Sequence, residues 1–150
     1  MTRLTMLLLL LSVSLCEARP IQYTARAISP PTTGYNDGDT IHVHLLRCLP
    51  LPGGERVCGN VRVRLRGIDA PEIGKKAPAC ERALGMKAKD ELEHLLPVGA
   101  RMTLTNIGRE KFGRPLATLI TANGVDVAQH LLDMHLVRPS SGQKKQPWCQ

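Results

Sequence analysis

Apolar and polar residues alternate along several short segments of the chain, which is the pattern of half-buried β-strands. In residues 39–46, Ile41, Val43 and Leu45 alternate with polar residues, and the alternation returns in residues 61–66. Other segments have the β-like composition without so regular an alternation: residues 21–29, 101–106 and 114–120. These patterns therefore predict five strands, with the second and third joined as a hairpin.

Two segments have apolar residues at helical spacing instead. In residues 80–99 the apolar positions Leu84, Ala88, Leu92, Leu95 and Leu96 recur on one face, until Pro97 and Gly99 end the pattern. Residues 125–136, VDVAQHLLDMHL, follow the Asn-Gly turn at 123–124 and predict a second helix. The expected fold is mainly β with helices (α+β), a five-stranded OB-type barrel with one helix between strands 3 and 4 and a second after strand 5.

The first 18 residues have the organisation of a secretory signal peptide. Arg3 precedes the apolar run at residues 4–15, and small residues follow, so we expect cleavage after Ala18 and a secreted or periplasmic protein. A lipoprotein signal ending at Cys16 is the alternative, but Leu15 is larger than the residue that such signals prefer there. The run is too short to cross a bilayer, which takes about 20 residues, and we expect no membrane span. Residues 19–150 are then one domain, since a chain of 150 residues is the size of a single ordinary domain.

The net charge of +7 belongs entirely to that domain, because the leader contains one arginine and one glutamate. A positive field attracts polyanions, although charge alone does not distinguish nucleic acid from an anionic cell surface. Four cysteines remain after the leader, and the compartment of an exported protein permits them to form disulfides. Cys48 and Cys58 flank a Pro/Gly-rich turn and predict one disulfide across the hairpin, which leaves Cys80 to bond Cys149. Zinc is the alternative, but no pair has the close spacing of zinc ligands.

Three charged clusters could contribute to a site. The first is DGDT, which contains Asp37 and Asp39 at the start of the second strand. The second is RLRGIDAPE, residues 64–72, and the third is EKFGR, residues 110–114, which contains the block KFGR. Alone, each has an ordinary explanation as a turn or a solvated strand face, and for Arg62 and Arg66 we keep that interpretation.

Together, the three clusters resemble the staphylococcal nuclease (thermonuclease) family in content, order and spacing, over residues 21–138. The resemblance implies an OB-type barrel with the activity of a calcium-dependent nuclease. Such an enzyme hydrolyses phosphodiester bonds of DNA and RNA and leaves 3′-phosphate ends. The expected partners are single-stranded or locally melted DNA and RNA, and the expected state is a monomer.

The resemblance also assigns roles to residues. Oxygen ligands suit Ca²⁺, and the assigned ligands are Asp39, Asp69 and the backbone carbonyl of Ala70, with Asp37 close by but not bound to the ion. Ala70 stands where the family has threonine, a change that a main-chain ligand tolerates.

The remaining roles concern the substrate. Glu72 is assigned as the general base, or alternatively as the residue that orients the attacking water. Arg64 and Arg114 are assigned to the phosphate, since a guanidinium grips two phosphate oxygens at once. Lys111 and Phe112 are assigned to substrate binding.

The chain departs from the family in its aromatic residues, which make up only 3% of the sequence. Phe112 stands where the family has tyrosine, and residues 138–141 lack the base-contacting tyrosines. We therefore expect substrate binding that depends on phosphate contacts and weakens with salt. The rival hypotheses are a non-catalytic OB-type module that binds nucleic acid or protein, and a basic structural protein of the cell envelope. His42 and His44 share a strand face without a third ligand, and we expect them to be exposed rather than bound to metal.

Overall fold

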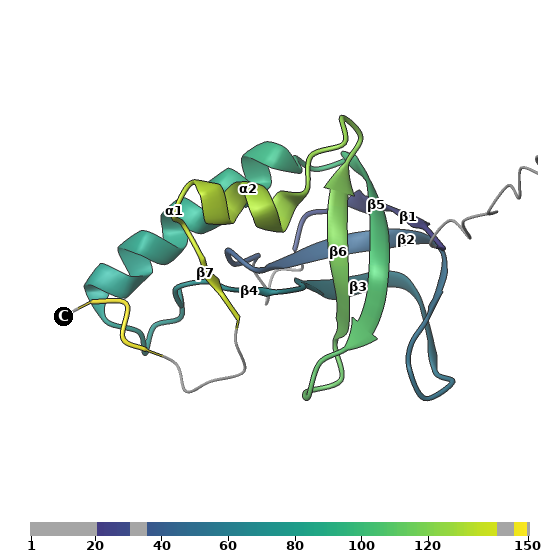
Figure 1. Ribbon diagram of the computed structural model, residues 1–150, viewed down its shortest axis with the longest axis horizontal. Helices are drawn as coiled ribbons and strands as arrows, with labels where there is room; N and C mark the ends of the chain where they lie inside the picture. Colours follow the sequence, from purple (N-terminus) through teal and green to yellow (C-terminus); the bar gives the residue numbers. More distant parts are fainter. Residues whose placement is uncertain (1–20, 31–35, 141–145, 150) are drawn as a thin grey trace, which may run out of the picture.

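The computed structural model describes residues 21–30, 36–140 and 146–149, so the predicted signal peptide lies outside the described residues. Five strands form a closed barrel in the order β1-β2-β3-β6-β5, as Figure 1 shows. Their bounds are Tyr23–Ala27 (β1), Thr40–Pro50 (β2), Arg56–Leu65 (β3), Arg101–Arg109 (β5) and Pro115–Thr121 (β6). The predicted OB-type α+β fold is confirmed.

The barrel is filled by apolar residues of its strands. Ile41, Val43 and Val63, from the two segments with regular alternation, are completely buried, and so are Leu104 and Leu119 of the other strands. Neighbouring strands are antiparallel, except that β3 and β6 are parallel, with Arg64 opposite Leu116. This parallel contact closes the barrel and brings the end of β3 beside the beginning of β6, two segments that are about 50 residues apart in sequence.

The two helices cover one end of the barrel and contact one another (Figure 1). Helix α1, Ala79–Leu95, buries Gly85, Ala88 and Leu92, whereas Leu84, which the pattern assigns to the buried face, is 37% exposed. Helix α2, Val127–Asp133, is shorter than predicted and begins where the Asp126 carboxylate accepts the Gln129 N–H at 3.1 Å. No helix in the described part of the chain is long and apolar enough to cross a membrane.

Two short strands were not predicted from the sequence. Strands β4, Ile68–Asp69, and β7, Arg138–Pro139, pair as a separate antiparallel ribbon beside the helices. Both are only two residues long, so neither shows a periodic pattern that sequence analysis could detect. The guanidinium of Arg138 in β7 stacks on the Trp148 ring at 3.9 Å, and both side chains line a cavity of about 790 Å³.

Both predicted disulfides are present. Cys48–Cys58 joins β2 to β3 in a hairpin that is longer than the sequence pattern indicated, with an irregularity in the register between Leu45 and Leu49. The irregularity explains why the alternation of β2 stops at Leu46 although the strand continues to Pro50. Cys80–Cys149 attaches the end of the described chain to the first turn of α1.

A candidate nuclease-like site

The site begins at the tight turn that leads into β2. Asp37 and Thr40 form a two-residue bridge, and the Asp37 carboxylate accepts the main-chain N–H of Asp39 at 3.3 Å. A Cβ on Gly38 would lie 2.5 Å from Cβ of Ala88 on α1, so only glycine allows this turn to pack against the helix. The close packing holds the Asp39 carboxylate at the end of the barrel, where its residue is only 4% exposed.

The second acidic segment follows β4 and also packs on α1. A Cβ on Gly85 of the helix would lie 2.6 Å from the Pro71 carbonyl oxygen, so the loop packs this closely on α1 because position 85 has no side chain. The Glu81 carboxylate in the first turn of α1 accepts the main-chain N–H of Glu72 at 3.0 Å. Helix α1 therefore positions both acidic segments. The Glu72 residue itself is exposed to solvent.

Arg64 joins the two segments. Its Nη1 lies 2.8 Å from Oδ1 of Asp39, and its Nη2 lies 3.1 Å from Oδ1 of Asp69. The other oxygen of Asp39, Oδ2, accepts the N–H of Ala70 at 2.9 Å, which brings the main chain at Ala70 beside this carboxylate. Three residues that the sequence assigns to the site from two different clusters are thus in direct contact.

The electrostatic environment of Asp39 is unfavourable for its charge. The pKa of Asp39 is raised from 3.8 to about 6, first by burial and then by the neighbouring Asp37 carboxylate, while Arg64 and the Ala70 N–H oppose the rise. An additional positive charge beside such a buried carboxylate would stabilise its anionic form. Site residues with perturbed pKa values are typical of functional clusters.

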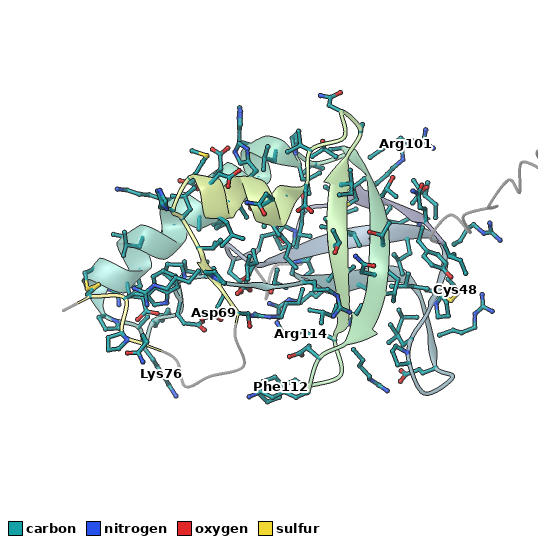
Figure 2. All side chains as sticks on the ribbon, viewed as in Figure 1. Cys48, Asp69, Lys76, Arg101, Phe112 and Arg114 are labelled. Carbon is teal, nitrogen blue, oxygen red and sulfur yellow. A yellow bond between two sulfur atoms is a disulfide. The ribbon has the colours of Figure 1, made fainter. Side chains whose placement is uncertain are left out.

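Arg114 reaches the same region from the turn before β6, the strand that pairs with the end of β3. Its Nε lies 2.8 Å from Oε1 of Glu110, and this hydrogen bond raises the pKa of Arg114 and lowers that of Glu110. Asp37 and Asp39 also raise the pKa of Arg114, which shows that its guanidinium lies within electrostatic range of both. In Figure 2, Asp69 and Arg114 are labelled in neighbouring parts of the view, between the helices and the turn that carries Phe112.

The substrate-binding candidates lie farther out. Lys111 and Phe112 are at the turn between β5 and β6, where Gly113 has a positive φ of 90°. Phe112 is 75% exposed, and the Lys111 ammonium lies 4.9 Å from the centre of its ring. In Figure 2 the Phe112 side chain points away from the barrel at the tip of this turn.

The donors suit a hard cation but form an incomplete ligand set. Among the described residues, no group of three or more His, Cys, Asp or Glu side chains is placed to hold a metal ion. A calcium ion would therefore need main-chain oxygen and water in addition to the carboxylates of Asp39 and Asp69. The buried oxygen donors and the raised pKa of Asp39 fit such an ion.

Sequence reasoning missed several residues that support the site. It gave no role to Gly85 of α1 or to Glu110, because neither the packing of the Pro71 loop on the helix nor the ion pair of Glu110 with Arg114 is visible in the sequence pattern. It was wrong about His42, which is 6% exposed rather than solvated. Asn36 Oδ1 accepts both the main-chain N–H of His42 at 2.9 Å and its ring Nδ1–H at 3.0 Å.

It was also wrong about Arg66. The side chain is half-buried rather than solvated, and its Nε donates to the Asn106 carbonyl at 2.9 Å, where β5 is irregular. Arg62 does have the exposed side chain that we expected, at 41%, with its guanidinium 3.9 Å from the Asp37 carboxylate.

The family model described as "Staphylococcal nuclease homologue" matches residues 62–146, more than half of the sequence. A comparison with curated proteins gives no match. The matched range includes the second and third charged clusters and both helices.

Proposed function

We propose, from the premise that the chain belongs to the staphylococcal nuclease homologue family, that it is a calcium-dependent nuclease. It hydrolyses phosphodiester bonds of DNA and RNA and leaves 3′-phosphate ends. The observation that best supports the proposal is the contact of Arg64 with both Asp39 and Asp69. Members of this family are typically nucleases, and generally depend on calcium.

The arrangement suits the chemistry of a phosphodiester. Hydrolysis adds negative charge to a group that is already anionic, so the site must provide positive charge that is preorganised for the transition state. Arg64 and Arg114 supply two permanently charged, planar forks that fit pairs of phosphate oxygens. In the free protein their guanidinium groups pair with Asp39, Asp69 and Glu110, so an anionic substrate competes with these carboxylates.

Glu72 is the proposed general base. Its carboxylate would take a proton from the attacking water, and its alternative role is to orient that water. The Glu81 carboxylate fixes the main chain at Glu72, which supports a defined position for this exposed residue. Pro71 restricts the backbone on one side of it.

The proposed ion is Ca²⁺, held by Asp39, Asp69 and the Ala70 carbonyl, with Asp37 near but not bound. When bound, it would supply positive charge beside the phosphate and neutralise the buried carboxylates. The role of Asp37 would be electrostatic, since it already raises the pKa of Asp39.

Export of the protein and the form of its substrate are part of the same proposal. Residues 1–18 would be removed as a signal peptide, leaving residues 19–150 as one monomeric nuclease domain. The two disulfides are compatible with an oxidising compartment. The preferred substrates would be single-stranded or locally melted DNA and RNA, gripped by Lys111, Phe112 and the arginines. Because stacking contacts are few, the Michaelis constant should rise steeply with salt.

The test is digestion of single-stranded DNA by the purified protein, in calcium or in a chelator. We expect cleavage only in calcium, and a reduction of kcat by about 10²–10⁴ in Glu72→Gln, the range of a general base. Asp90→Asn is the matched control, because it removes an exposed carboxylate from the middle of α1. A wild type that does not cut, or a Glu72→Gln protein that cuts as well as the control, would refute the proposal.

The second candidate function is a non-catalytic OB-type module that binds nucleic acid or protein. Its support is the exposed Phe112, which could stack on a base or a partner without any chemistry. The presence of Asp39, Arg64, Asp69, Glu72 and Arg114 together favours the enzyme, since a binding module has no need of all five. Binding of an oligonucleotide without cleavage under any metal condition would favour the module.

A further inference from the structure

Charged residues are distributed unevenly between the strands and the rest of the described chain. The five barrel strands contain seven arginines and two histidines but no aspartate, glutamate or lysine. The carboxylates of the described residues therefore all lie in turns, helices and the β4 ribbon. An arginine on the outer wall of the barrel has no acidic residue on its own or a neighbouring strand.

Three basic side chains stand in one line across this wall. The strand register places Arg26 of β1 opposite His44 of β2 on one side and opposite Arg101 of β5 on the other. Residues directly opposite one another in antiparallel strands point to the same face, with Cβ atoms about 5 Å apart. All three residues are exposed. We call Arg101, Arg26 and His44, together with Arg62, the basic row.

Arg62 links the line to the candidate site. It shares the outer face of β3 with Asn60, which lies opposite His44 and whose Oδ1 accepts from the His44 ring Nδ1 at 2.7 Å. In the other direction the Arg62 guanidinium approaches Asp37. Counting about 4.8 Å between strands and about 6.6 Å for two residues along β3, the basic row extends about 20 Å from Arg62 to Arg101.

The direct opposition of Arg26 and Arg101 is unfavourable in the free protein, because like charges facing each other across a strand pair repel. Within the described residues, neither arginine has an ion pair, and the hydrogen bond of Arg26 is to the uncharged Gly99 carbonyl at 3.3 Å. An anion between the two guanidinium groups removes the repulsion. A phosphate fits because each guanidinium can grip two of its oxygens.

We propose that the basic row is an extended binding surface for the phosphates of a single-stranded nucleic acid whose cleaved bond lies at Arg64 and Arg114. The strand would pass from Arg62 over β2 and β1 to Arg101, around the wall of the barrel. This inference rests on the proposed function. Nucleic acid is favoured over other polyanions because the row is continuous with the site through Arg62, rather than isolated on another part of the surface.

The experiment measures binding of a fluorescent single-stranded 12-mer in a chelator, at several salt concentrations. In the double variant Arg26→Gln, Arg101→Gln we expect about tenfold weaker binding at low salt. The slope of log Kd against log salt should fall by about 1.4, at about 0.7 per phosphate contact on a single strand. A dinucleotide is too short to extend from the site onto the basic row, so its binding should not change.

The matched control is the double variant Lys76→Gln, Lys87→Gln. It removes the same charge from the loop before α1 and from α1 itself, and Figure 2 shows Lys76 and Arg101 at opposite ends of the molecule. The control should keep the wild-type slope. Equal losses in both double variants, or an unchanged slope in the first, would overturn the proposal. So would variants that lose binding to heparin but not to the 12-mer, because the surface would then face another polyanion.

Hydrolysis of a nitrophenyl thymidine phosphodiester separates this proposal from the proposed function. The substrate reaches only the site, so the basic-row variant should hydrolyse it with the wild-type kcat/KM. A loss of hydrolysis in that variant would mean that the arginines act on the site itself, which contradicts an extended surface. If the wild type hydrolyses nothing, the proposed function fails, while the salt slope still decides whether the basic row binds nucleic acid.

Discussion

The pKa of Asp39 leads to a pH dependence of stability with a definite sign. The folded protein raises this pKa from 3.8 to about 6, so the folded state holds a proton that the unfolded chain has already lost. A group with a raised pKa contributes most stability below its unfolded value and loses that contribution as the pH rises through its folded value. The two pKa values differ by an amount equivalent to about 3 kcal/mol, at about 1.4 kcal/mol for each tenfold change.

The perturbation that isolates this effect is Asp39→Asn, which removes the titration and keeps the shape of the side chain. We expect the free energy of unfolding of the wild type, relative to the variant, to fall by about 2 kcal/mol between pH 4 and pH 7 in a chelator. The assay is urea unfolding at each pH, followed by circular dichroism. Subtracting the two proteins cancels the titrations that they share.

Two further measurements check the cause. Asp37→Asn removes the neighbouring charge that helps to raise the pKa, so it should move the fall in stability to lower pH. Saturating calcium should stabilise the wild type at pH 7 more than Asp39→Asn, by about 3 kcal/mol at a hundred times the dissociation constant. A difference that stays flat with pH, or that grows as the pH rises, would refute the argument that burial opposes the charge of Asp39.

Two more predictions concern the support of the site. Gly85→Ala should destabilise the protein by about 1–3 kcal/mol, because the new Cβ would press on the Pro71 carbonyl and outweigh the usual gain of about 1 kcal/mol from alanine in a helix. A variant with raised thermal stability and full activity would show that the loop yields easily. Replacing Cys80 and Cys149 with serine should cost about 4 kcal/mol in urea unfolding, from the entropy of a loop with a sequence separation of 69. An unchanged unfolding midpoint would mean that this bridge does not restrict the unfolded chain.

The fold could be predicted from the sequence because the strand pattern, the helix pattern and the cysteine positions all indicated the same architecture. Alternation identified β2 and β3, β-like composition indicated the other three barrel strands, and a disulfide across a hairpin requires the hairpin that alternation predicts. The errors occurred where contacts between side chains, rather than the pattern of a single segment, decide the outcome. Leu84 has the spacing of a buried helix residue, but the loop at Pro71 packs beside Gly85 instead. The exposure of His42 could not be judged without Asn36, which holds it in place.

The candidate site was predicted as a set of residues but not as an arrangement. Motif spacing identified Asp39, Arg64 and Asp69, yet nothing in the sequence indicates that one guanidinium contacts both carboxylates. Sequence patterns also did not reveal Glu110 as the partner of Arg114, because a short turn brings these two residues together only after Gly113 adopts its positive φ. These charge pairs depend on side-chain contacts in the folded chain, which the periodicity of the sequence does not encode.

The separation of charges connects the site to the basic row. Carboxylates near the site lie in the turn before β2, in β4 and in the turn after β5, and each approaches an arginine that a strand or a turn presents. These pairs reduce the local field, so the guanidinium groups of Arg64 and Arg114 attract a distant polyanion only weakly. Arg26 and Arg101 have no such partner among the described residues, and their field extends into solvent. A polyanion would therefore first bind the wall of the barrel, and the nucleic-acid strand would enter the site afterwards. Removing Arg26 and Arg101 should accordingly slow the association of long substrates more than it slows their cleavage once bound.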